Sequence, residues 1–322
     1  MSYKPMIMNN AQGARQIITT LTAIAQKVSE QKFYEIPFAD YVPVVTGVGA
    51  YDYDILNWRS FSKDDGFEKG LIGTSSNRAQ RGQSDAVFDA IKQKTQFWAK
   101  NIEWSVIELE QAAKANNIFS LVEARERARK KAWDLGLQKI AFLGLDNDAE
   151  IKGLLNSALV LNDTTTIVKP IKAMTAAELQ VFVGAVYEKY RANCVRTAKP
   201  TKFIIPEGEF NGLHNFPDIT FPLKTRMEIL LESFKSLTGN QAFEIMPCAY
   251  ADKANNPMVV NRYVLTVDDP TSVVMNLPID YTVTQAGTED GFSWVNSAYG
   301  QFSGVTFLRE KETLYFSHAV AL

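Results

Sequence analysis

The chain has 322 residues, of which 46% are hydrophobic and 22% charged, an ordinary balance for a globular protein of one large or two smaller domains. Its 34 basic and 36 acidic residues give a net charge of −2, which excludes a protein that holds nucleic acid through overall basicity. Cys194 and Cys248 are the only cysteines and lack C-x-x-C spacing, so neither a disulfide framework nor a zinc site is expected.

The N-terminal part predicts one helix followed by an extended arm. Residues 14–30 place apolar side chains on one helical face, at Ile17, Ile18, Leu21, Ile24, Ala25 and Val28. Residues 33–58 are rich in aromatic and β-branched residues and contain two prolines, which favours edge strands or an arm. We find no signal peptide and no run of 18 apolar residues, so no membrane segment is expected and synthesis is assigned to a cytoplasm.

The next segment, residues 55–100, is polar and contains four glycines, with little to bury by itself. Short alternating pieces at 58–61 and 86–88 favour a two-stranded ribbon, and so long a segment with no core is typical of a functional arm. Its aromatic rings argue against a disordered linker and require a surface, which another subunit can supply. The residues predicted to contact a neighbouring subunit here are Trp58, Phe61, Lys63, Phe67, Lys69, Arg78 and Arg81.

Two helices are predicted next, each beginning at a capping box, in which a Ser hydroxyl and a Glu carboxylate satisfy amides of the first turn. The boxes are Ser105–Glu108 and Ser120–Glu123, and the second helix runs to about Leu143, roughly 36 Å at 1.5 Å per residue. Its small residues, Ala124, Ala128 and Ala132, predict a face against which another element lies closely. The charged residues of this helix indicate a solvated face, from which Arg125 and Arg129 are candidates for contact with an adjacent subunit.

The second half predicts an α+β arrangement, because strands and helices do not alternate regularly. Capping boxes begin helices at Thr175 and Thr225, and Gly239 ends the second of these helices. Strands are predicted at 202–206, 243–247, 262–267, 304–308 and 313–316.

The sequence offers little for catalysis. His214 and His318 are the only histidines, and neither lies in a recognisable motif; no phosphate-binding or dinucleotide-binding glycine motif is found. Residues 146–150 begin like a calcium loop, but Ile151 occupies the position that needs glycine for the turn. We therefore expect no catalytic, cofactor-binding or metal-binding residues and no cofactor.

The order of these parts resembles one known family. The segments that carry the likeness are Trp104–Ala113, Glu123–Arg129, Phe142–Leu145, Ile151–Asn156, Ser303–Arg309 and Leu314–Phe316. Together they resemble the major capsid proteins of tailed bacteriophages with the Hong Kong 97-type fold. The resemblance implies an N-terminal arm (1–54), an extended loop (55–103), a peripheral domain with a long spine helix (104–160), an axial domain (161–255), and closing strands shared by both domains (256–322).

The same resemblance implies a structural protein that assembles into hexamers and pentamers of an icosahedral head. That head would enclose double-stranded DNA without sequence-specific binding, in a virion assembled in the host bacterial cytoplasm. The chain shows no long charged helical prodomain, so a separate scaffolding protein is expected, together with a portal. Lys63 and Lys69 lie in the loop, but no Asn partner with a catalytic carboxylate is evident, so no covalent cross-link is predicted.

Two alternatives stay open at this point. An encapsulin-like bacterial compartment protein shares the fold and encloses enzymes instead of DNA. A soluble α+β enzyme with an unrecognised site would instead be a monomer or a small oligomer with a polar pocket.

Overall fold

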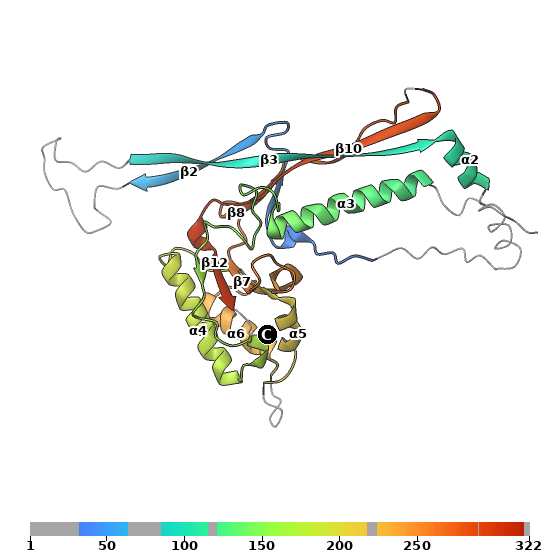
Figure 1. The fold of residues 1–322 in the computed structure, drawn as a ribbon. Coiled ribbons are helices and arrows are strands. Elements are labelled where there is room, and N and C mark those ends of the chain that lie inside the picture. Colours follow the sequence, from blue (N-terminus) through green and yellow to red (C-terminus); the bar gives the residue numbers. More distant parts are fainter. Residues whose placement is uncertain (1–31, 64–84, 115–120, 218–223, 289, 319–322) are drawn as a thin grey trace, which may run out of the picture.

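The computed structural model describes residues 32–63, 85–114, 121–217, 224–288 and 290–318. Long strands run across the top of the molecule, the helix α3 lies beneath them, and the helices α4, α5 and α6 surround the lower part (Figure 1). The predicted helix at 14–30 and the capping residue Ser120 lie outside the described residues. In the described part of the chain, no helix has both the length and the hydrophobicity needed to cross a membrane.

The helices are α2 (Val106–Lys114), α3 (Leu121–Leu143), α4 (Ala176–Asn193), α5 (Glu207–Leu213) and α6 (Arg226–Thr238), with short 3-10 turns η1 (Phe38–Asp40), η4 (Ile171–Ala173), η5 (Ala249–Ala251) and η6 (Glu310–Glu312). The strands are β1 (Val44–Thr46), β2 (Asp54–Lys63), β3 (Asp85–Ser105), β4 (Asn162–Asp163), β5 (Lys202–Pro206), β6 (Glu244–Cys248), β7 (Asn261–Thr266), β8 (Val273–Leu277), β9 (Ile279–Val283), β10 (Ser293–Ser303), β11 (Val305–Phe307) and β12 (Leu314–His318). This mixture confirms the predicted α+β class.

The strands form three sheets, with the orders β1-β8-β11, β2-β3-β10-β9 and β4-β12-β7-β5-β6. The second sheet is built on β3, which pairs antiparallel with β2 through its first half and with β10 through its second half. The β2–β3 pair extends from Asp54 opposite Lys94 to Lys63 opposite Asp85. It therefore confirms the predicted two-stranded ribbon, which projects sideways from the rest of the molecule (Figure 1).

The helix α3 packs beneath β3 and β10 through its large side chains. The ring of Trp133 lies 5.1 Å from that of Trp98, and a Cβ added at Gly300 would come within 2.4 Å of Trp133. The predicted close-packing face was wrong, because Ala128 and Ala132 are exposed while Trp133 is buried. The contact is a bulky indole against a glycine in the facing strand, not a stripe of small residues on the helix.

The five-stranded sheet lies between two hydrophobic cores. Successive residues of β5 and β7 face opposite cores: Ile204 and Val264 belong to the core shared with α3, whereas Phe203 and Leu265 belong to the core covered by α4 and α6. Because both faces of the sheet are covered, every residue of β5 and β7 is buried, and the centre of β5 is a short apolar run at Phe203, Ile204 and Ile205. That property made β5 recognisable from sequence.

Three of the predicted helix starts are confirmed by their hydrogen bonds. Ser105, Thr175 and Thr225 each exchange bonds with the Glu three residues later, and Gly239 ends α6 with φ of +67°. The helix α5 was missed in the sequence. It has only seven residues, and Pro206 at its N-cap makes no side-chain capping bond, so the capping box that marks the other predicted helix starts is absent.

Candidate assembly surfaces

The ribbon has one face toward the body of the molecule and one toward solvent. Ile55 and Gln93 are buried on the inner side, at 6% and 4% exposure. On the outer side, Leu56, Trp58 and Phe88 are 55%, 68% and 67% exposed. The register places Trp58 opposite Ala90 and Ser60 opposite Phe88, so the three apolar side chains share one face, called here the ribbon face.

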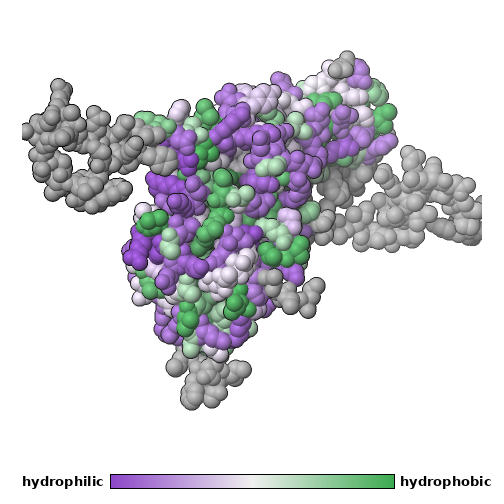
Figure 2. Space-filling model, turned by 60° about the vertical axis from the view of Figure 1, so that its left-hand side comes forward, coloured by the Kyte–Doolittle hydropathy of each residue, from purple (hydrophilic) through white to green (hydrophobic). Residues whose placement is uncertain are grey.

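The exposed apolar groups are not confined to single scattered residues. Figure 2 shows hydrophobic patches among the hydrophilic surface, including green residues directly beside the grey end of the ribbon. Contiguous apolar surface of this kind on a soluble protein usually marks a site of protein association. The ribbon face is therefore the first candidate for contact between subunits.

The root of the ribbon is held by a buried amide. The Gln93 amide donates to Ser303 Oγ at 2.7 Å and to the Gly304 carbonyl at 2.8 Å. Its oxygen accepts from Asn276 at 2.5 Å and from Asn57 at 3.0 Å. Both the donor and acceptor capacity of this amide are used, so β2, β3, β8 and β10 are joined at one point.

Two sets of ion pairs add to this attachment on either side of the ribbon. Arg59 of β2 contacts Asp89 at 2.7 Å and Glu310 at 3.1 Å, and its bonds hold the pKa of the Asp89 carboxyl below its usual value. Lys94 of β3 contacts Asp148 at 2.8 Å and Glu150 at 3.1 Å. Hydrogen bonds that Lys94 donates to both carboxylates, Asp148 first, raise the pKa of Lys94.

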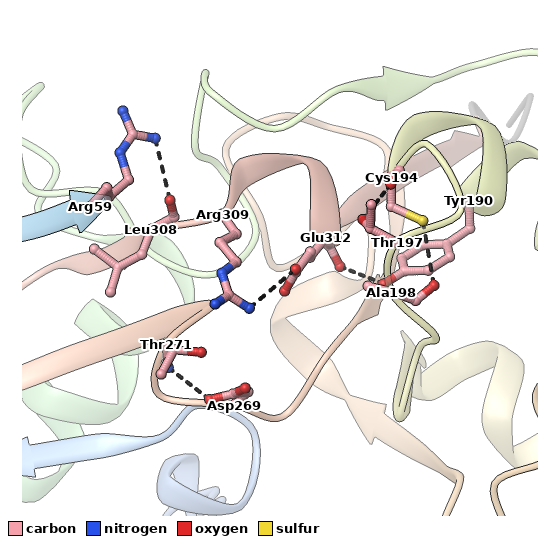
Figure 3. A network of polar contacts seen from close by, with 10 residues as sticks. All are labelled: Arg59, Tyr190, Cys194, Thr197, Ala198, Asp269, Thr271, Leu308, Arg309 and Glu312. Atoms are coloured by element: carbon pink, nitrogen blue, oxygen red, sulfur yellow. Dashed lines mark hydrogen bonds and ion pairs between the residues drawn. The ribbon is translucent and has the colours of Figure 1, made fainter. Parts of the chain in front are cut away.

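Residues 308–312, which include the turn η6, contact both Arg59 of the ribbon and the lower part of the molecule (Figure 3). Arg59 donates to the Leu308 carbonyl at 3.3 Å, and Tyr190 of α4 donates to the Glu312 carbonyl at 2.8 Å. The turn η6 thus connects the ribbon root to the end of α4. A cleft of about 620 Å³ lies between them, lined among others by Trp58, Cys194 and Pro270.

The structure describes only some of the residues predicted to contact a neighbour. Trp58 lies on the ribbon face. Phe61 and Lys63 lie in β2, although their side chains are outside the described part, as are the whole residues Phe67, Lys69, Arg78 and Arg81.

Of the two candidates on α3, one is buried. Arg129 is 1% exposed and donates to Tyr281, to the Lys100 carbonyl and to Asn296 within its own chain. The prediction that it contacts an adjacent subunit was therefore wrong. Arg125 is partly exposed and pairs with Glu108 at 3.1 Å, so its contact with a neighbour stays a prediction.

The residues with catalytic potential do not converge. Cys194 and Cys248 are buried free thiols, and burial raises the pKa of Cys248 to about 12, which keeps it protonated. His214 is exposed and packs edge-on against Phe210. Within the described residues, no group of three or more His, Cys, Asp or Glu side chains is placed to hold a metal ion.

Several solved structures have the same architecture. The capsid of Myoviridae phage XM1 matches with a TM-score of 0.75 at 13% identity, over 98% of this chain and 100% of that chain. A structure from Mycobacterium phage Che8 matches with a TM-score of 0.57 at 15% identity, over 91% and 95% of the two chains. The capsid of a native GTA particle matches with a TM-score of 0.56 at 12% identity, over 98% and 100%. No curated protein sequence matches the chain.

These likenesses, together with the ribbon, the long helix and the lower α+β unit, define the Hong Kong 97-type fold. The family model described as Major capsid protein matches residues 76–318. The chain belongs to that family: it is a structural protein of the virion capsid and not an enzyme.

Proposed function

We propose that the chain self-assembles into hexamers and pentamers that form the icosahedral head of a tailed bacteriophage. The observation that carries this proposal is the exposed ribbon face, formed by Leu56, Trp58 and Phe88. Trp58 lines the cleft beside α4 but is still 68% exposed, so its own chain covers little of this face and another molecule can bury the rest. In a closed ring of identical subunits, the contact joins two different surfaces of the same chain, and many such contacts sum to a stable shell.

Within this proposal, residues 55–103 form the extended loop that overlaps a neighbouring subunit, next to the N-terminal arm at 1–54. Residues 104–160 form the peripheral domain, 161–255 the axial domain, and 256–322 the closing strands. The β2–β3 pair begins at Asp54 opposite Lys94, which supports the start of the loop at residue 55, whereas residues 95–103 of β3 pair with β10 of the body. The proposed contact residues are Trp58, Phe61, Lys63, Phe67, Lys69, Arg78, Arg81 and Arg125.

The proposed contents of the shell are double-stranded DNA bound without sequence specificity, and the proposed partners are a scaffolding protein and a portal. Assembly would take place in the cytoplasm of the bacterial host. The net charge of −2 supports the proposed DNA content, because a strongly cationic inner wall would bind packaged DNA tightly through the release of counterions.

The test is electron microscopy and sedimentation of the purified full-length chain, followed by analysis of what the particles contain. We expect capsomer rings or shells tens of nanometres across, and nucleic acid in particles recovered from infected cells. A sharp monomer under all assembly conditions would contradict the proposal. Particles that contain a cargo enzyme and no nucleic acid would instead identify an encapsulin-like compartment.

A further inference from the structure

A second exposed apolar surface lies on the body of the molecule, where four aromatic side chains meet in solvent. The rings of Tyr51 and Phe97 are stacked with centroids 6.5 Å apart, and Tyr53 packs edge-on against Phe97 at 6.1 Å. The hydroxyls of Tyr51 and Tyr299 lie 3.4 Å apart. Tyr51, Tyr53 and Phe97 are 66%, 76% and 38% exposed, so this group, called here the aromatic patch, leaves much ring surface in water.

Buried polar groups fix the turn that presents these rings. Tyr51 has φ of +68°, an uncommon conformation for a bulky side chain. The fully buried Gln301 accepts from the Tyr51 amide at 2.8 Å and donates to the Asp52 carbonyl at 2.6 Å, and Thr95 Oγ1 donates to the same carbonyl at 2.6 Å. Backbone strain that the surroundings enforce in this way is commonly found at functional positions.

The patch lies on the side of the four-stranded sheet that faces away from α3. Phe97 and Trp98 are consecutive in β3, so they point to opposite faces, and Trp98 packs against Trp133 of α3. Tyr299 of β10 is on the Phe97 side, because its partner in the register is Ala99. In the part of the chain that the structure describes, this side of the sheet leaves the rings exposed.

We propose that the aromatic patch of one copy receives the ribbon face of a neighbouring copy. This inference rests on the proposed function and names the surface that the ribbon binds. The two surfaces cannot cover each other within one chain. Phe88 and Phe97 lie about 30 Å apart along β3, and their odd separation turns them to opposite sides of the strand.

The two surfaces have the properties that a head-to-tail ring requires. One is carried on a projecting arm and the other on a fixed sheet (Figure 1), and they are different patches of the same chain, as a ring of identical subunits demands. Both are apolar and aromatic, with Trp58 on one and Tyr51 and Tyr53 on the other. Tryptophan and tyrosine are the residues most often found at the energetic centre of protein interfaces.

The first test uses single charged substitutions in the full-length chain. Trp58→Glu alters the ribbon face and Tyr53→Glu alters the patch, and each should lower the yield of particles by at least about tenfold. The matched control is Val181→Glu on α4, a residue that is 74% exposed and belongs to neither surface. Circular dichroism and thermal unfolding of the three variants establish that each subunit is folded.

The second test asks whether the two surfaces meet each other. An equimolar mixture of the Trp58→Glu and Tyr53→Glu variants retains one intact ribbon and one intact patch, so sedimentation should show a heterodimer that neither variant forms alone. Combining Trp58→Glu with Tyr53→Lys in one chain should restore particles through an ion pair between copies. Combining Trp58→Glu with Val181→Lys should not.

The outcomes separate the two proposals. If the wild-type chain forms particles and the Trp58→Glu and Tyr53→Glu variants do so equally well, the pairing of these surfaces is wrong while the capsid function stands. If both variants fail to assemble but give neither heterodimer nor charge rescue, the surfaces meet other partners and the pairing is again wrong. If the wild-type chain never assembles, the proposed function itself fails.

Discussion

Arg129 is a charged residue that forms part of the structural joint between α3 and the sheet. Its guanidinium donates to the Tyr281 hydroxyl at 2.9 Å, to the Asn296 carbonyl at 2.8 Å and to the Asn296 side chain at 2.7 Å. Among the residues that the structure describes, none of its hydrogen bonds goes to a carboxylate. The charge is therefore stabilised by carbonyl, hydroxyl and amide oxygens of β3, β9 and β10. Only a planar group with several donors, such as a guanidinium, can form hydrogen bonds with all of these oxygens together.

Replacing this arginine should destabilise the subunit. Arg129→Met keeps much of the apolar stem but leaves buried oxygens without donors, so we expect the free energy of unfolding to fall by about 3 kcal/mol. Chemical denaturation of the unassembled subunit measures this change in the free energy of unfolding. Lys130→Met, at an exposed position of the same helix, is the control and should leave the free energy nearly unchanged. Equal stability of the two variants would show that the Arg129 bonds contribute little.

At the level of single residues, contacts between neighbours in the sequence could be predicted, whereas the burial of a side chain could not. The caps at Ser105, Thr175 and Thr225 were predictable because both partners lie within four residues of each other. Arg125 and Arg129 look equivalent in the sequence, one helical turn apart. Only the position of α3 against β3 and β10 decides that one is partly exposed and the other buried, and that position depends on residues far away in the chain.

Among the secondary-structure elements, α4 has a cap whose strength depends on ionisation. Thr175 Oγ1 accepts from the Glu178 amide, and the Glu178 carboxylate accepts from the Thr175 amide at 2.7 Å and from Lys169 at 2.8 Å. The bond from Lys169, followed by the bond from the Thr175 amide, lowers the pKa of Glu178 from 4.5 to about 2. The carboxylate is thus more acidic in the folded chain than in the unfolded chain.

This pKa shift sets the direction of a pH effect. A lowered folded-state pKa contributes stability that is present above the unfolded value of 4.5 and is lost as the pH falls toward 2. Glu178→Gln removes the charge, so the wild type should be more stable than the variant at pH 6, and the difference should shrink between pH 4.5 and pH 2. Thermal unfolding across this range measures the effect.

The second capping box provides the control for α4. Glu228 in α6 also has a lowered pKa, caused first by its bond from the Thr225 amide; among the described residues no lysine donates a hydrogen bond to it, and Lys224 contributes through its charge alone. Glu228→Gln should therefore give a difference of the same sign and smaller size. If the difference between wild type and Glu178→Gln did not vary with pH, ionisation of the cap would have no part in the stability of α4.

At the level of elements, the ribbon was predictable but its attachment was not. Alternating residues and glycines between 55 and 100 indicate a hairpin-like pair, and β2 and β3 form it. The second half of β3 pairs with β10, almost two hundred residues later, and the Gln93 amide joins β8 and β10 to the root. Such long-range pairings leave no local pattern in one sequence, because each strand needs only to be compatible with a sheet.

The whole molecule combines a body that contains two hydrophobic cores with a projecting ribbon that lies outside them. The core residues that the structure describes all lie outside residues 60–85, and so do Asn57, Arg59 and Gln93, which make the root bonds. Deleting residues 60–85 should therefore leave a subunit with unchanged circular dichroism and an unfolding midpoint close to that of the wild type. The same deletion should abolish particles in electron microscopy, because the arm supplies the contact with the neighbouring copy. A deletion variant that unfolds would show that the arm supports its own subunit, and one that assembles as the full chain does would show that the shell is held by other surfaces.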